Sequence, residues 1–333
     1  MAIPGGTIRI NLTISAGRVV AVRIGAREVD SVARVFEGMT VAEVPGRIGA
    51  MYSLCSKAQT IAALQAIEAA TGMRVPDGVR AARDVLRLSE MLTQTAMRLA
   101  LHWPKALGLA MQPDLVRDCM AAEKKLETAL FGGAEWQVPG AGLSGEGTAC
   151  DPVITRLALS VEEFTAQTHL QEVLKKARLE RFGVLPEGLA PEQGVLTRQW
   201  DAPEVACVRA ALGSGLAARL TASRAELAAQ PGQISAAMEQ VSPAVPVSPL
   251  HSDGEGVAEV ETARGPLRHW AKVAKGRIAT YGIDAPTEMN FRPGGPVEAG
   301  LIGAPEAGIE QAAQLHILAI DPCVEFTLEL SHA

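Results

Sequence analysis

The sequence predicts an α+β protein that is mainly α-helical, with long core helices, an N-terminal β-hairpin and a small C-terminal β region. Hydrophobic residues make up 48 % of the 333 residues but aromatic residues only 4 %, a balance that favours helices packed through small side chains. β-branched alternation occurs near the start and in the last quarter of the chain, whereas helical periodicity fills much of the sequence between them. Together these observations favour helical layers with small sheets.

The first predicted element is a hairpin in the segment 7–24, where β-branched residues alternate on both sides of a short glycine-containing turn. Ser56 is the expected cap of the first long helix, and Gly72 its stop signal. Pro104 is expected to end the second helix. Apolar periodicity predicts helices at about 56–71, 77–102, 113–130, 161–181, 204–212 and 215–239.

Two segments rich in glycine or proline interrupt this pattern. Residues 131–152 predict a loop or short hairpin, and 240–256 a connector. Past the connector, GVAEVETARG and GRIATYGI predict short strands separated by HWAKVAK. We expect a single domain over residues 1–333, with both segments as internal loops.

Composition excludes several classes of partner. The net charge of −6 comes from mixed signs, with no block of Lys and Arg to neutralise phosphates, so nucleic acid is not expected. The start lacks a secretory pattern, and no window reaches the roughly 20 apolar residues of a membrane span, so we expect a cytoplasmic protein with no membrane partner. The five cysteines do not form a disulfide framework; they lie at positions 55, 119, 150, 207 and 323.

Specific motifs gather in the last quarter of the chain. Residues 260–293 resemble the pattern of nickel-iron hydrogenase large subunits in which Glu-Ala-Pro-Arg-Gly precedes a leucine, a histidine and Pro-Thr-x-Trp-Asn. The next landmark of that family is Asp-Pro-Cys-x-x-Cys-x-x-His. This chain has Asp321-Pro322-Cys323, but Phe326 replaces the second cysteine and Glu329 the histidine. Residues 105–190 carry no comparable match.

A second family motif, Cys-x-x-Cys-x-x-x-His followed by a glutamate nine residues later, falls near the start. With Glu68 on that glutamate, Gln59 takes the place of the histidine, Cys55 of the second cysteine and Tyr52 of the first. Gly5 stands where the family has a proton-relaying glutamate. Both cysteine pairs have therefore lost one member.

The resemblance implies a hydrogenase large-subunit-like fold with an altered metal site. In the family, four thiolates hold nickel and two of them also bridge to iron, so a chain with half of them is not expected to bind nickel. The iron brings two cyanides and one carbonyl of its own, and the resemblance implies Cys55 and Cys323 as its remaining metal ligands. Arg264 and Thr287 fall where the family donates hydrogen bonds to the cyanides.

Each of these residues also has a simpler interpretation. A cysteine is most often a buried small hydrophobe, although Cys55 just before a helix is expected to favour the thiolate. Arg264 could pair with Glu261, and Thr287 could cap a turn. For Glu68, the simpler interpretation is a solvated surface charge.

Taken together, these features resemble the HupK/HoxV accessory proteins, shortened relatives of the large subunit. The resemblance implies a non-catalytic scaffold in hydrogenase maturation, on which the iron with its cyanides and carbonyl is held before transfer. The implied partners are hydrogenase maturation proteins and the apo hydrogenase large subunit. Two alternatives stay open: an active hydrogenase large subunit with a degenerate site, and a metal-free structural relative.

Overall fold

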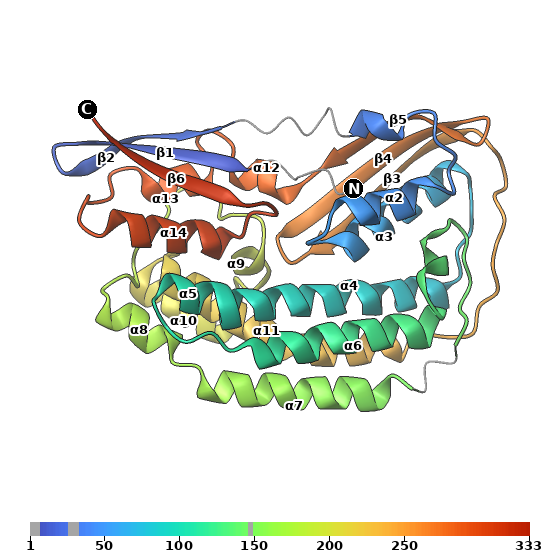
Figure 1. Cartoon of the computed structure of the whole chain (residues 1–333), viewed down its shortest axis with the longest axis horizontal. Helices are drawn as coiled ribbons and strands as arrows, with labels where there is room; N and C mark the ends of the chain where they lie inside the picture. The colour runs from blue at the N-terminus through green and yellow to red at the C-terminus, as the bar shows by residue number, and fades with distance from the viewer. Residues whose placement is uncertain (1–6, 26–32, 146–148) are drawn as a thin grey trace.

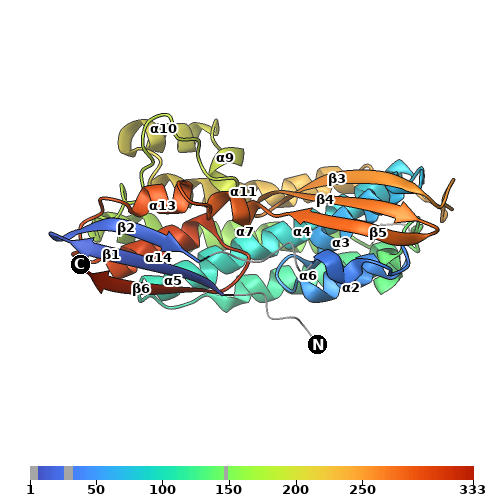
Figure 2. The same ribbon diagram turned by 90° about the horizontal axis from the view of Figure 1, so that it is seen from above.

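The computed structural model describes residues 7–25, 33–145 and 149–333, and position 5 lies outside these ranges. Two small β-sheets cover one face of a layer of long helices, as Figure 1 shows. The view from above places one sheet toward each end of the molecule (Figure 2). No helix in the described ranges combines the length and apolarity that a membrane span requires.

The first sheet joins the two ends of the chain. Strands β1 (Ile8–Ser15) and β2 (Arg18–Ile24) form the predicted antiparallel hairpin. Ala16 and Gly17 have φ of 49° and 72°, the left-handed conformation that a tight two-residue hairpin turn requires. Strand β6 (Phe326–His332) then pairs in parallel with β1.

The second sheet is an antiparallel meander of β3 (Gly254–Thr262), β4 (Gly265–Ala274) and β5 (Arg277–Asp284). The prediction that HWAKVAK separates two strands is wrong, because all of its residues except Lys275 belong to β4. Alternate β4 residues from Leu267 to Val273 are buried, and a histidine, His269, takes one of these inward positions. A polar residue at an inward position disguises the alternation in the sequence.

The first long helix, α3 (Ser56–Ala70), matches its prediction. The next prediction is wrong at its end: α4 (Asp77–Met97) continues through a π-helical turn (Arg98–His102) into α5 (Trp103–Ala106), past Pro104. The N–H group of Gln112 donates to the Ala100 carbonyl at 2.8 Å, so this carbonyl has a hydrogen-bond partner although Pro104 lacks an N–H.

The remaining long helices agree with the sequence except at one point. In place of one helix over 161–181, α7 (Asp151–Gln167) and α8 (Leu170–Lys176) are separated by Thr168, whose extended backbone turns the chain so that α8 can bury two leucines. The other helices are α2 (Val44–Met51), α6 (Pro113–Phe131), α9 (Val195–Arg198), α10 (Pro203–Leu212), α11 (Leu216–Met238), α12 (Pro286–Asn290), α13 (Pro296–Leu301) and α14 (Ile309–Ile320), with short 3-10 turns at Arg34–Phe36 and Ala134–Gln137.

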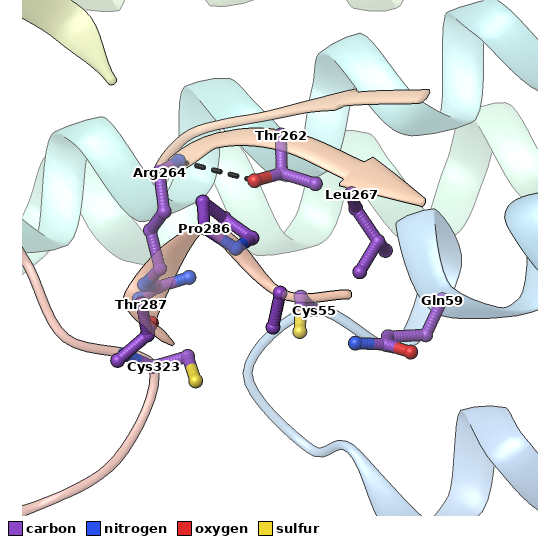
Figure 3. A pocket seen from close by; sticks show the side chains of 9 residues that line it. Cys55, Gln59, Thr262, Arg264, Leu267, Pro286, Thr287 and Cys323 are labelled. Atoms are coloured by element: carbon purple, nitrogen blue, oxygen red, sulfur yellow. Dashed lines mark hydrogen bonds between the residues drawn. The ribbon is translucent and has the colours of Figure 1, made fainter. Parts of the chain in front are cut away.

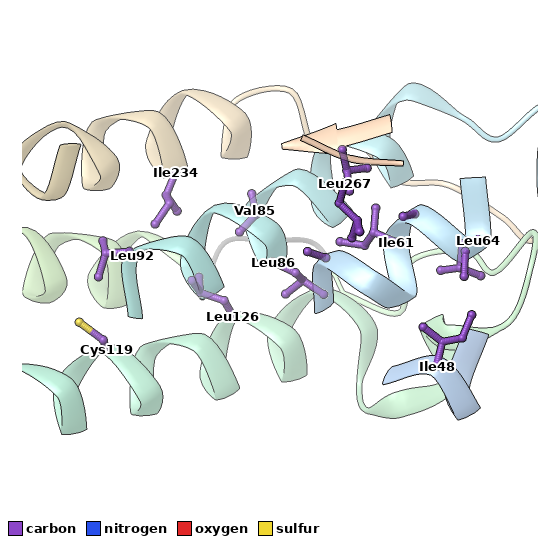
Figure 4. Close-up of a cluster of buried hydrophobic side chains, with 14 of the residues drawn as sticks. Ile48, Ile61, Leu64, Val85, Leu86, Leu92, Cys119, Leu126, Ile234 and Leu267 are labelled. Carbon is purple, nitrogen blue, oxygen red and sulfur yellow. The ribbon is translucent and has the colours of Figure 1, made fainter. Parts of the chain in front are cut away.

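The main apolar core lies between the helices and the second sheet (Figure 4). Ile61 of α3, Leu86 of α4, Leu126 of α6, Ile234 of α11 and Leu267 of β4 belong to it, and all are at most 1 % exposed. A second apolar cluster packs the first sheet against α13 and α14. The candidate site lies where α3, β4 and α12 approach one another.

Candidate metal-binding site

One cavity brings together all four site residues predicted from the sequence (Figure 3). Cys55, Arg264, Thr287 and Cys323 come from segments far apart in the chain, and each lines this cavity, which holds about 270 Å³ of empty space partly open to solvent. The structure therefore gives them a shared site. The other lining residues are Gln59, Thr262, Leu267, Ala285 and Pro286.

Cys55 occupies the N-cap position of α3, a place that the sequence had suggested for Ser56. Its side chain is only 7 % exposed. The Glu90 carboxylate accepts hydrogen bonds from the Lys57 and Ala58 N–H groups at 2.8 and 3.0 Å, so it already satisfies the positive end of the helix.

The expectation that Cys55 favours the thiolate is wrong for the protein alone. Burial, together with the nearby Cys323 and Glu90, raises the pKa of its thiol to about 12, and Arg264 only partly opposes them. Cys55 is therefore a protonated thiol until a cation replaces its proton.

Cys323 lies in the loop between α14 and β6 and is half-buried. Its backbone N–H donates to Thr287 Oγ1 at 3.2 Å, which ties this loop to the first turn of α12. The Thr287 hydroxyl thus binds a residue 36 positions away, so the alternative that it only caps a turn is wrong. Because the hydroxyl oxygen accepts this bond, the Thr287 O–H proton is still available for donation.

Arg264 sits in the tight turn between β3 and β4, where its own N–H donates to Thr262 Oγ1 at 3.1 Å. Its guanidinium Nη1 donates to Gln94 Oε1 at 2.6 Å, and Nε lies 3.2 Å from Asp321 Oδ2. The suggested pairing with Glu261 is wrong, since Glu261 binds Arg198 at 2.5 Å. A guanidinium has five N–H donors, and these contacts engage only some of them.

The charge of Arg264 interacts with both cysteines. Burial acts to lower the pKa of its guanidinium, but Asp321, Cys55 and Cys323 outweigh burial and leave the pKa raised above its ordinary value. The cavity wall thus carries a buried, permanently charged cation beside two thiols.

A hydrogen-bonded chain that the sequence did not reveal runs from Gln59, which lines the cavity, into the protein. Gln59 Oε1 lies 2.9 Å from His269 Nε2, and His269 Nδ1 lies 2.7 Å from the Tyr281 hydroxyl. Burial lowers the pKa of His269 to about 3, so the imidazole is neutral and links Gln59 to Tyr281 through hydrogen bonds. Gln59 thus stands at the cavity where the family pattern has a histidine.

The residues present suit a metal that carries ligands of its own. Within the described ranges, no group of three or more His, Cys, Asp or Glu side chains could hold a metal ion. Two thiols are soft ligands for a late transition metal, and they leave most coordination positions to other donors. The arrangement fits a metal that brings ligands of its own better than a bare ion.

Similar proteins support the motif-based resemblance, although no family model matches the chain. The chain is 28 % identical, over 98 % of its length and 97 % of the relative, to the hydrogenase expression/formation protein HupK of Rhizobium leguminosarum bv. viciae. It is also 28 % identical to HupV of Azotobacter chroococcum mcd 1, over 98 % of this chain and 99 % of that one. The chain is thus similar over nearly its whole length to these hydrogenase expression/formation proteins. HoxV of Cupriavidus necator is 36 % identical over 24 % of this chain and 23 % of its own.

Solved structures of hydrogenases resemble this chain. The nickel-iron-selenium hydrogenase of Desulfovibrio vulgaris Hildenborough in its reduced state matches with a TM-score of 0.72 at 17 % identity, over 94 % of this chain and 95 % of that one. The enzyme of Desulfomicrobium baculatum gives 0.70 at 16 % identity, over 94 % and 95 %. The predicted hydrogenase large-subunit-like fold is therefore confirmed.

Proposed function

We propose that this protein is a non-catalytic assembly scaffold in nickel-iron hydrogenase maturation, which holds iron carrying two cyanides and one carbonyl before the apo large subunit receives it. The strongest support is that Cys55 and Cys323, from opposite ends of the chain, line one cavity with Arg264 and Thr287. The names of the full-length relatives place them in hydrogenase expression and formation.

The two thiols would supply two ligands to the iron and leave one coordination position open. Two cyanides, one carbonyl and two thiolates leave one position of a six-coordinate iron for water or another weak ligand. Binding requires loss of the Cys55 proton, and burial makes that loss costly. Near neutral pH a proton competes with the metal for such a thiolate and lowers its apparent affinity, which suits a site that must release its cargo.

Arg264 and Thr287 would recognise the cyanides. Bound cyanide accepts hydrogen bonds at nitrogen, and the guanidinium of Arg264 and the hydroxyl of Thr287 are donors at the cavity wall. Groups of this kind orient and tune a bound metal. The buried cation also complements the negative charge that cyanides and thiolates bring.

The two alternatives fit these residues less well. An active hydrogenase would need nickel, but Tyr52 and Phe326 stand where the family has two of its thiolates. A metal-free structural relative would have no need to bring two thiols, an arginine and a threonine to one cavity. The scaffold also accounts for the proposed partners, which are maturation proteins and the apo large subunit.

Cysteine variants test the proposed ligands directly. In protein purified from a host that expresses the hydrogenase maturation machinery, Cys55→Ala and Cys323→Ala should each lower the iron content at least about tenfold, because each removes one of two protein ligands. Cys207→Ala is the matched control, since Cys207 is exposed and does not line the cavity. Elemental analysis measures the outcome. Iron that persists in both ligand variants would exclude these ligands, and equimolar nickel in the wild type would favour the hydrogenase alternative.

A further inference from the structure

Helix α4 presents three buried polar side chains at four-residue spacing to the site. Glu90, Gln94 and Arg98, the last at the start of the π-helical turn, are 5 %, 8 % and 1 % exposed. Side chains four positions apart on a helix are neighbours on one face. Buried polar groups need partners: Glu90 and Gln94 form hydrogen bonds outside α4 and Arg98 forms an ion pair there, in each case with segments that carry site residues.

Glu90 and Gln94 both hold the segment around Cys55. Glu90 binds the N–H groups of Lys57 and Ala58, the second and third residues after Cys55. Gln94 Nε2 donates to the carbonyl of Leu54, directly before it. The cysteine is therefore held on both sides by two side chains of α4.

Gln94 also connects this segment to Arg264. Its Oε1 accepts from Arg264 Nη1 at 2.6 Å while its amide nitrogen binds Leu54. Only a side chain with both a donor and an acceptor can make these two bonds at once. A carboxylate would lose the bond to Leu54, and an apolar residue would lose both.

Arg98 extends the same face of the helix to the second cysteine. Its Nη2 lies 3.5 Å from Asp321 Oδ2, the oxygen that also lies 3.2 Å from Arg264 Nε. Asp321 closes α14 with φ of 62°, an unfavourable conformation for a residue with a Cβ, and it stands two residues before Cys323. The two guanidinium groups help to hold Asp321 in that conformation.

We infer that this face of α4 aligns the site and that Gln94 is the positioning residue that sets the Cys55 segment against Arg264. The contacts of Glu90, Gln94 and Arg98 hold both thiols ready for one ligand that bonds to two sulfur atoms and presents anionic or hydrogen-bond-accepting groups to Arg264. This inference deepens the proposed function and rests on it, but the alignment itself exists before any cargo arrives.

A trivalent arsenical, phenylarsine oxide, probes the alignment without iron. Its arsenic forms bonds to two sulfur atoms, while its oxygen takes the two thiol protons and leaves as water, so no oxidant or reductant is needed. The wild-type apoprotein should bind one equivalent that survives gel filtration, measured by intact mass, and Cys55→Ala should lose it. Gln94→Leu should retain about tenfold less, and Gln94→Glu an intermediate amount, because it keeps the acceptor for Arg264.

Thr95→Val is the matched control. Thr95 is buried on the same helix, but its hydroxyl donates to the Met91 carbonyl of that helix at 2.9 Å, so arsenical retention should equal that of the wild type. In iron-loaded protein, Gln94→Leu should also shift the infrared cyanide bands, whereas Thr95→Val should not. Retention and bands that stay unchanged in Gln94→Leu would overturn the inference, as would arsenical binding by Cys55→Ala. Wild-type protein whose arsenical binding depends on Gln94 but which never carries iron would support the alignment and refute the proposed function.

Discussion

Replacing Arg83 with methionine should lower the free energy of unfolding by about 3–5 kcal/mol, the cost of leaving a buried charge without its partner. Arg83 and Glu68 are 1 % and 5 % exposed at their side chains and form a two-pronged ion pair at 2.7 and 2.8 Å. Glu68 Oε1 also accepts from the Gly140 N–H at 2.8 Å. The pair therefore joins α3, α4 and the loop after α6, and Arg83→Met strands the Glu68 carboxylate among them.

Urea unfolding measures this loss of stability, and two further variants serve as controls. Arg80→Met, one turn earlier on α4, breaks an exposed pair with Asp77 and should change stability by less than about 1 kcal/mol. The double variant Glu68→Met with Arg83→Met should be more stable than Arg83→Met alone, since it strands no charge. A loss for Arg83→Met no larger than that for Arg80→Met would contradict this interpretation.

Gly256→Ala should be the second most damaging change, with a loss of about 1–3 kcal/mol from overpacking. Gly256 lies on β3 against the backbone of α3, and a Cβ at this position would lie 2.1 Å from the Ala66 carbonyl oxygen and 2.4 Å from the Ala70 nitrogen. Backbone atoms cannot rotate aside as a side chain does. The strand must move away from the helix that carries Cys55 at its start.

The matched control is Gly232→Ala in α11, where an added Cβ meets no atom within 4 Å. Because alanine favours the helix over glycine, this variant should gain about 0.5–1 kcal/mol. Thermal unfolding of both variants gives the comparison. If Gly256→Ala unfolds at or above the wild-type midpoint, β3 does not pack on α3 as closely as described.

Local sequence patterns predicted most elements but misplaced those whose boundaries depend on distant groups. The hairpin and α3 follow from patterns within their own residues. Pro104 did not end its helical run, because the N–H group of Gln112, which lies beyond the run, satisfies the Ala100 carbonyl. The strand β4 was not predicted over its full length, because His269 is a polar residue at an inward position and its partners Gln59 and Tyr281 lie on other elements.

The residues of the candidate site were likewise predicted only in part. Motif positions identified Cys55, Cys323, Arg264 and Thr287, because the resemblance marks each of them individually. Gln94 carried no signal, since a lone polar residue in a helical run looks like a solvated position. The surface interpretation of Glu68 fails for this reason too: its partner Arg83 comes from the next helix, and the sequence does not show that the two meet.

Infrared spectroscopy of the purified wild-type protein tests the central claim most directly. Carbonyl and cyanide bound to iron absorb where protein groups do not, so protein from a host with active hydrogenase maturation should show bands from one carbonyl and two cyanides. These bands should be lost in Cys55→Ala and Cys323→Ala and kept in Cys207→Ala. Wild-type protein without such bands, or bands that persist in both cysteine variants, would contradict the account.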